Sequence, residues 1–175
     1  MKVKKLIVGP LATNCYILID NNDCLIIDPG DDYEIIKNEI GSLNVLAILI
    51  THYHFDHIGA LEKLKQDYDV SIYDYKMKEN KYKINNFKFE IIYTPGHKDD
   101  AVTFYFKENK LMFVGDFIFK NSIGRTDLET GDFKKMQESL KRIKNYNDDI
   151  ELLPGHGNST VLGIEKQNNY YLRNI

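Results

Sequence analysis

Short runs of apolar residues, separated by turn-forming residues, make up most of the chain. Such runs are typical of β-strands, and the run at 45–50, apolar at successive positions, indicates a central strand buried on both faces. Two pairs of runs predict hairpins, one turning at Asn21-Asn22 and the other at Glu108-Asn109. We predict strands at 3–8, 14–19, 24–27, 45–50, 70–73, 87–93, 102–106, 111–114 and 150–153.

Other segments carry apolar residues at helical spacing, three or four positions apart. From this spacing we predict helices over 33–40, 55–64 and 133–143. Asp132 can cap the last of them. The polar, lysine-rich segment 74–86 is interpreted as a solvated connection. Because hairpins are mixed with helical crossovers, we expect one domain, residues 1–175, with two sheets and outer helices.

Composition and charge narrow the classes of function. Hydrophobic residues make up 43% and charged residues 28% of the 175 residues, as in ordinary globular proteins. The net charge of −3 argues against a nucleic-acid partner, which needs a basic surface. No long apolar segment is present, so we expect neither a signal peptide nor a membrane partner. Cys15 and Cys24 lie roughly 13 Å apart on the predicted hairpin, too far for a disulfide, and free thiols favour a cytoplasmic location.

Directly after the central strand, a short stretch combines His52, His54, Asp56 and His57. His52 and His54 project to the same side if the strand continues through them. Imidazole and carboxylate groups together suit divalent metals such as zinc, iron or manganese. A lone histidine at a strand end is usually an ordinary polar residue, but this stretch holds three of the chain's five histidines. We therefore interpret it as a metal-binding stretch.

Three further residues repeat one pattern, in which a strand is followed by glycine and then by a candidate ligand. They are His97, Asp116 and His156. Alone, Asp116 fits a turn cap and His156 a turn histidine, but the small residue before each lets the backbone approach a shared point. The combined candidate ligands are His52, His54, Asp56, His57, His97, Asp116 and His156. Seven ligands are too many for one tetrahedral ion and suit two ions that share a bridging carboxylate and a bridging water.

The stretch from His52 to His57 resembles the His-x-His-x-Asp-His signature of the metallo-β-lactamase superfamily, and in particular the short glyoxalase II-like hydrolases. Similarity to that family's other signatures extends over segments 9–16, 28–30, 115–119, 122–127, 154–157 and 165–169. The resemblance implies an α/β fold (α+β in some schemes). Its form is a four-layer αβ/βα sandwich of two mixed β-sheets with outer helices and with the metals at one edge.

The same resemblance implies how the ligands divide between two divalent ions. The first ion is expected at His52, His54 and His97. The second is expected at Asp56, His57 and His156, with Asp116 between the two ions. Zinc is the expected metal, and the same ligands also accept iron or manganese.

The resemblance further implies a metal-dependent hydrolase, a thioesterase of glyoxalase II type acting on a small-molecule thioester or ester. A metal-bridging hydroxide is expected to attack the carbonyl, with Asp56 orienting it. The chain departs from the family at 98–100, where Lys-Asp-Asp replaces Thr or Ser and Pro-Gly, and at Phe117, which replaces Thr. The sequence ends at Ile175 without the helical domain that binds glutathione in glyoxalase II. We therefore do not expect strict glutathione specificity.

Other functions fit the resemblance less well. Mono-iron persulfide dioxygenases share the fold and a stretch similar to 124–127, but they use fewer of these ligands. A phosphodiester hydrolase is disfavoured by the acidic net charge. A non-catalytic metal-binding module is expected to have lost some of the ligands that are present here. Arg125 can meet an anionic substrate group, although an ion pair with Asp127 is the preferred interpretation.

Overall fold

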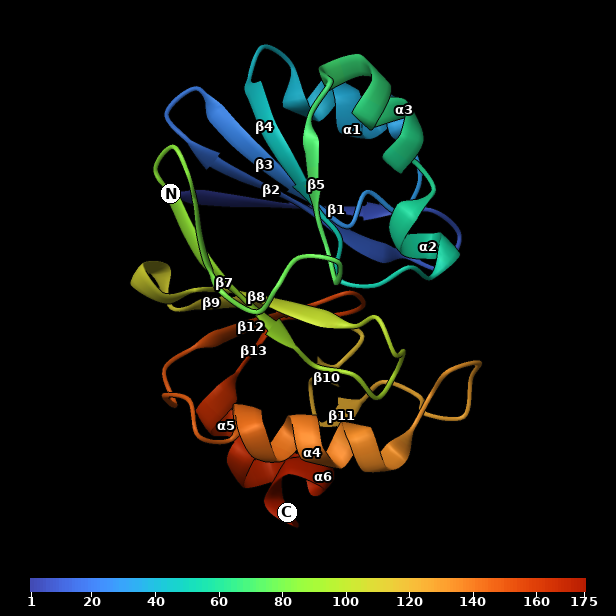
Figure 1. The fold of residues 1–175 in the computed structure, drawn as a ribbon, viewed down its shortest axis with the longest axis vertical. Helices are drawn as coiled ribbons and strands as arrows, with labels where there is room; N and C mark the ends of the chain where they lie inside the picture. The colour runs from blue at the N-terminus through green and yellow to red at the C-terminus, as the bar shows by residue number, and fades with distance from the viewer.

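Two β-sheets pack against each other, with helices on their outer faces (Figure 1). The computed structural model describes residues 1–175. The first sheet has the strand order β1-β2-β3-β4-β5. Its strands are β1 (Lys2–Val8), β2 (Thr13–Asp20), β3 (Asp23–Ile27), β4 (Asn44–Leu49) and β5 (Ser71–Tyr73). The sheet is mixed, because β1 to β3 pair antiparallel whereas β3 to β5 pair parallel.

The second sheet has the order β13-β12-β9-β8-β7-β6 and is also mixed, since β12 runs parallel to β9. Its strands are β6 (Lys81–Ile84), β7 (Phe87–Tyr93), β8 (Val102–Phe106), β9 (Leu111–Gly115), β12 (Glu151–Pro154) and β13 (Thr160–Val161). A separate two-stranded ribbon is formed by β10 (Ile118–Phe119) and β11 (Ser122–Ile123).

The helices fall into two groups that lie at opposite ends of the molecule in Figure 1. Beside the first sheet lie α1 (Tyr33–Ile40), α2 (Phe55–Ile58) and α3 (Leu61–Tyr68). Beside the second sheet lie α4 (Phe133–Ile143), α5 (Leu162–Asn168) and α6 (Tyr170–Arg173), and a 3₁₀ turn, η1, covers Lys107–Asn109. None of the helices has the length and apolar character that crossing a membrane requires.

Three apolar clusters hold the layers together, one between the sheets and one beneath each group of helices. Alternation along β3 shows how one strand serves two of them. Leu25 and Ile27 enter the cluster between the sheets, whereas Cys24 and Ile26 enter the cluster under α1 and α3. A strand buried on both faces in this way needs a nearly continuous apolar run. The predicted four-layer sandwich of two mixed sheets is confirmed.

The predicted pairing of the first hairpin is confirmed as well. Ile19 lies opposite Cys24, as expected for a turn at 21–22. Cys15 instead lies opposite Leu6 on β1, and both cysteines are buried free thiols. The prediction that they do not form a disulfide is therefore correct.

The prediction that 74–86 is only a solvated connection is wrong. Residues 81–84 form β6, the edge strand that pairs with β7. Tyr82 and Ile84 face the cluster between the sheets, while the alternating Lys81 and Lys83 remain exposed. Lysines on an edge strand discourage pairing with other chains. Because every second residue of this strand is a lysine, its sequence resembles that of a polar loop.

The predicted continuous helix over 55–64 is also wrong, since it is divided into α2 and α3 at Gly59 and Ala60. The N–H of Gly59 donates to the carbonyl of Gly30 at 2.9 Å, and that of Ala60 donates to Pro29 at 3.0 Å. A Cβ on Gly59 would lie 2.2 Å from the same Gly30 oxygen. The loop that carries Gly30, which precedes α1, therefore packs directly against the chain at the point where α2 and α3 are separated. The short elements β10, β11, β13, α5 and α6 were not predicted.

Candidate metal centre

The ends of four strands place the candidate ligands at one edge of the sandwich. The stretch after β4 supplies four ligands from the first sheet, and the turns after β7, β9 and β12 supply three from the second. All seven predicted residues belong to groups whose ligand atoms lie within 4.8 Å of one another: His52, His54, Asp56, His57, His97, Asp116 and His156. The structure therefore gathers all seven at the edge where the strand-end pattern expected them, and their role as metal ligands stays a prediction.

The first cluster consists of three imidazoles. The Nδ1 atom of His54 lies 3.0 Å from Nε2 of His52 and 2.9 Å from Nε2 of His97. Ligand atoms at the corners of a tetrahedral zinc site are about 3.3 Å apart, given Zn–N bonds near 2.05 Å. His52 and His97 are buried and His54 is half-buried, so the group is open to solvent on one side. Three converging nitrogens with one open side suit a catalytic metal.

The second cluster contains Asp56, His57 and His156. Oδ2 of Asp56 lies 3.1 Å from Nε2 of His156 and 3.6 Å from Nε2 of His57. Asp116 lies between the two clusters. Its Oδ1 is 3.4 Å from Nε2 of His57, and its Oδ2 is 3.5 Å from Nε2 of both His97 and His156. One carboxylate therefore reaches both groups, as a bridging ligand must.

Two buried atoms in this arrangement lack any hydrogen-bond partner, Nε2 of His57 and Oδ1 of Asp116. Leaving a buried polar atom without a partner costs about 1–3 kcal/mol, so such atoms are rare unless something else satisfies them. The two atoms lie 3.4 Å from each other, and both are ordinary ligand atoms for a divalent ion. The residues present therefore fit a pair of metal ions.

A layer of hydrogen bonds behind the ligands fixes which imidazole nitrogen faces the site. Asp28 accepts from Nδ1 of His57 at 2.9 Å and from the amide and hydroxyl of Thr51 at 2.8 and 2.6 Å. Nδ1 of His52 contacts the Thr51 hydroxyl at 3.1 Å, and Nδ1 of His97 donates to the carbonyl of Arg125 at 2.7 Å. With each Nδ1 engaged in this way, Nε2 is left free to bind a metal.

Negative charge is concentrated around His57. Burial alone lowers the pKa of this imidazole, but the nearby carboxylates of Asp28 and Asp116 outweigh burial and raise the pKa to about 10. The pKa of His52 is instead held well below its usual value, first by burial and then by the neighbouring His57 and His97. The carboxylates around His57 thus favour a cation at this point of the site, whereas His52 stays a neutral imidazole.

The second cluster also depends on the start of β2, a contribution that the sequence analysis did not identify. The hydroxyl of Thr13 donates to Oδ2 of Asp56 at 2.8 Å. The side-chain amide of Asn14 donates to the carbonyls of Pro154 and Gly157 at 2.9 and 3.0 Å. These bonds fix both sides of the turn that carries His156. Asp28, Thr51, Thr13 and Asn14 are polar residues buried next to strand ends, and this burial could not be read from the sequence.

Arg125, the predicted substrate contact, lines the hollow above the clusters. Its guanidinium is engaged with Asp127 through two N–H···O contacts of 2.9 Å, and both side chains are exposed. The preferred interpretation of Arg125 as an ion-pair residue is therefore correct, and its contact with substrate stays a prediction. The hollow itself measures about 530 Å³ and includes the exposed sides of both clusters.

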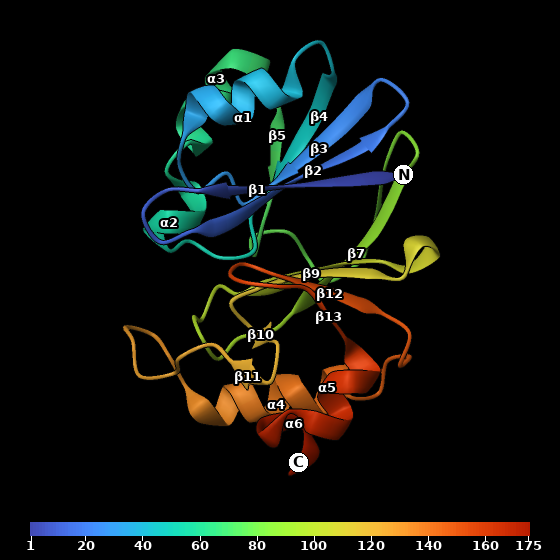
Figure 2. The same ribbon diagram turned by 180° about the vertical axis from the view of Figure 1, so that it is seen from behind.

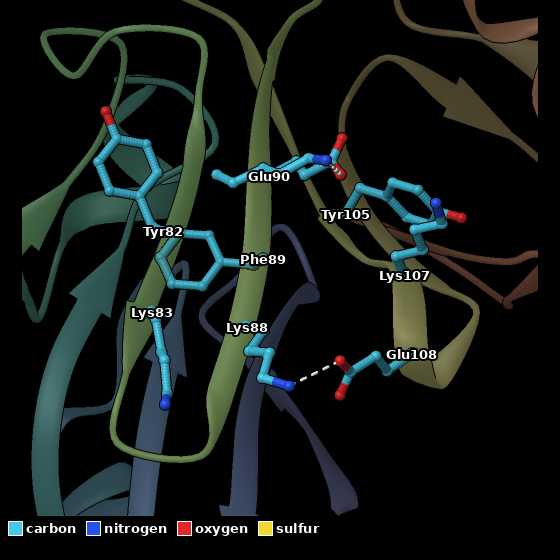
Figure 3. A pocket seen from close by; sticks show the side chains of 9 residues that line it. Tyr82, Lys83, Lys88, Phe89, Glu90, Tyr105, Lys107 and Glu108 are labelled. Atoms are coloured by element: carbon cyan, nitrogen blue, oxygen red, sulfur yellow. Dashed lines mark hydrogen bonds and ion pairs between the residues drawn. The ribbon is translucent and has the colours of Figure 1, made fainter.

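A different hollow, of about 330 Å³, lies on β6, β7 and β8 and is shown in Figure 3. Lysines, glutamates and aromatic residues line it, and Lys88 points toward Glu108 at 2.8 Å. No histidine, cysteine or aspartate is among its lining residues. None of its lining residues belongs to the three groups that could hold a metal ion, which lie at the hollow above the two clusters.

Comparison with known proteins agrees with the geometry. Residues 8–85 and 82–156 match the sequence model of the Metallo-beta-lactamase superfamily. The probable metallo-hydrolase YqgX of Bacillus subtilis is 32% identical, over 98% of this chain and 98% of its own. The hydroxyacylglutathione hydrolase GloC of Haemophilus influenzae is 31% identical, again over 98% of each chain.

Solved structures show the same arrangement of the backbone. The BLEG-1 B3 metallo-beta-lactamase has a TM-score of 0.94 at 29% identity, covering 98% of this chain and 99% of its own. TTHA1623 in a di-iron-bound form has a TM-score of 0.88 at 31% identity, covering 97% of this chain and 100% of its own. The chain therefore belongs to the metallo-beta-lactamase superfamily, as a metallo-hydrolase whose histidine and aspartate clusters are consistent with a dinuclear metal site.

Proposed function

We propose that the protein is a thioesterase of glyoxalase II type, which hydrolyses a small-molecule thioester or ester with the help of two divalent metal ions. The observation that carries this proposal is the position of Asp116, whose two oxygens lie 3.4–3.5 Å from histidines of both clusters. The name of the relative GloC, a hydroxyacylglutathione hydrolase 31% identical to this chain, supports the thioester. The buried free thiols of Cys15 and Cys24 support a cytoplasmic location.

The residues divide between the two ions as the clusters suggest. His52, His54 and His97 would hold the first ion, and Asp56, His57 and His156 would hold the second. Asp116, whose oxygens lie near histidines of both clusters, would serve both. When bound, such ions would supply an acidified water and would polarise the substrate carbonyl. Zinc remains the expected metal, while the di-iron form of TTHA1623 makes iron a concrete alternative.

The chain's own residues have three tasks in this reaction. Asp56, held by Thr13 at 2.8 Å, is positioned to orient the attacking water and accept a hydrogen bond from it. Asp28 holds His57 in one orientation. The open side of the His52, His54 and His97 cluster leaves room for the carbonyl oxygen. Water adds to the carbonyl carbon and the C–S bond breaks, so the products are a carboxylic acid and a thiol.

No side-chain nucleophile is required. Cys15 and Cys24 are buried within strands, and burial raises the pKa of both thiols, that of Cys24 to about 12. Neither is therefore a nucleophile at neutral pH.

The test combines metal content with turnover of S-D-lactoylglutathione, followed by release of free thiol. We expect two metals per chain and thiol release, with both reduced in Asp116→Asn. Arg173→Gln, on α6, is a surface control. A protein with two metals that hydrolyses no thioester and no ester would overturn the proposal. One iron per chain with oxygen uptake on glutathione persulfide would replace it with the dioxygenase, and metal without turnover would leave a binding module.

A second candidate reaction is hydrolysis of a β-lactam amide. It is favoured by the similarity to BLEG-1, which carries the name of a B3 metallo-beta-lactamase and has a TM-score of 0.94. The same clusters and the same attacking water serve both reactions, because each adds water to a carbonyl carbon. Hydrolysis of the chromogenic cephalosporin nitrocefin, measured beside the thioester, decides which carbonyl is preferred by the ratio of the two kcat/KM values.

A further inference from the structure

The hollow above the metal clusters has an apolar rim. Leu11, Phe55, Phe119 and Leu128 line it, next to the exposed sides of the ligands. Three of these side chains are unusually exposed for large apolar residues, since Phe55 is 72%, Leu11 50% and Leu128 37% accessible. Exposed apolar side chains gathered around one hollow mark a surface that a ligand covers when it binds.

The rim is built from separate parts of the chain. Leu11 comes from the turn between β1 and β2, Phe55 opens α2, and Leu128 lies in the loop before α4. The β1–β2 turn lies beside α2 in Figure 2, and a second hollow of about 270 Å³ between them shares Leu11 and Phe55 with the first. The apolar surface therefore continues away from the clusters along this side.

The rim offers little to a charged substrate group. Outside the metal ligands, only Arg125 and Glu129 among the lining residues carry charge. Both carboxylate oxygens of Asp127 already accept hydrogen bonds from Arg125, and Glu129 is itself an anion. No lysine lines the hollow. The glutathione part of a thioester carries two carboxylates, and this rim supplies no unpaired cation for either of them.

We propose that the site prefers thioesters and esters whose acyl group and thiol are uncharged, with an apolar acyl chain, over thioesters of glutathione. This inference rests on the proposed function and specifies its substrate class. The apolar chain lies against Leu11, Phe55 and Leu128, while the reacting carbonyl faces Asp116. Binding is then driven by covering exposed apolar surface and requires no ion pair.

The test uses a series of acyl thioesters of N-acetylcysteamine, a neutral thiol, from acetyl to octanoyl, with S-D-lactoylglutathione as the charged comparison. We expect kcat/KM to rise by about fourfold for each added methylene that the rim covers. Leu11→Ser and Leu128→Ser should flatten this dependence while metal content stays unchanged. Ile35→Ser on α1, an equally exposed apolar residue outside the rim, is the matched control and should retain the full dependence.

A readout without turnover separates this inference from the proposed function. Calorimetry compares two uncleavable thioethers, S-octyl-N-acetylcysteamine and S-octylglutathione, which differ only in the charged peptide part. Tighter binding of the neutral thioether, together with weaker binding of it by Leu128→Ser, supports the inference. If the protein binds in this way but cleaves no thioester, the inference stands and only the proposed function fails. Equal or tighter binding of S-octylglutathione, or a kcat/KM that does not change with the length of the acyl chain, overturns the inference.

Discussion

Replacing Gly155 with alanine should disable the metal centre by steric contact alone. Gly155 lies between the end of β12 and His156, and its N–H and carbonyl bond to Gly115 and Asn14 at 2.8 and 2.7 Å. A Cβ at this position would lie 2.3 Å from Oδ1 of Asp116 and 2.5 Å from Cε1 of His57. These two atoms belong to one carboxylate ligand and one imidazole ligand of the proposed centre, Asp116 and His57.

The size of the effect follows from these distances. An ordinary contact begins at 3.4 Å, so the Asp116 carboxylate must retreat by about 1 Å (3.4 − 2.3). Metal–ligand distances tolerate only about 0.2 Å, and a shift of about 1 Å at a reacting centre costs roughly 100-fold in rate. Overpacking of this kind lowers the free energy of unfolding by about 1–3 kcal/mol, so the variant should still fold.

The assay measures bound metal by mass spectrometry and kcat/KM by thiol release, beside thermal unfolding of each variant. Gly157→Ala is a matched control in the same turn. Its φ of +73° strains an alanine, but a Cβ there meets nothing within 4 Å, so it should lose some stability and keep both metals. If Gly155→Ala retained two metals and activity within threefold of the unmodified protein, the steric reasoning would be refuted.

Three further results are expected. His54→Ala should lose metal and activity but keep its circular dichroism spectrum, because His54 is half-buried in a loop. Full activity in this variant would contradict the role of His54 as a ligand. Thr13→Val removes the donor to Asp56 and should weaken the second metal by about tenfold in a chelator competition, whereas unchanged affinity would make that bond structural only. Cys15 and Cys24, whose pKa values are raised by burial, should not react with a disulfide reagent at neutral pH until the protein is unfolded; rapid labelling of the native protein would show that the strands open.

Much of the fold could be predicted from the sequence because apolar alternation follows burial directly. β4 is apolar at successive positions and is an interior strand that pairs with β3 on one side and β5 on the other, as its pattern indicated. β6 escaped prediction because a lysine-bearing edge strand has the composition of a loop. The break between α2 and α3 escaped because its cause, the carbonyl of Gly30, lies far away in sequence.

The gathering of the candidate ligands could be predicted for a different reason, since histidine after a strand end is rare and specific. Their supports could not be. Asp28 and Thr13 are ordinary residue types in the sequence, and only the folded arrangement of β2, β3 and α2 shows that Asp28 orients His57 and Thr13 orients Asp56. Polar residues that act through a neighbouring ligand have no pattern of spacing, so they emerge only from three-dimensional contacts.

The hydrogen bond from the Asn14 side chain to the carbonyl of Pro154 also determines the earliest time during synthesis at which the complete site can form. The two residues are separated by 140 positions in the chain. At about 5–20 residues per second, a ribosome needs on the order of 10 s to travel from one to the other. For most of that interval the nascent chain carries His52 and His54 but lacks the turn that completes the second cluster. Loading of the proposed second metal therefore has to wait until synthesis has passed residue 156.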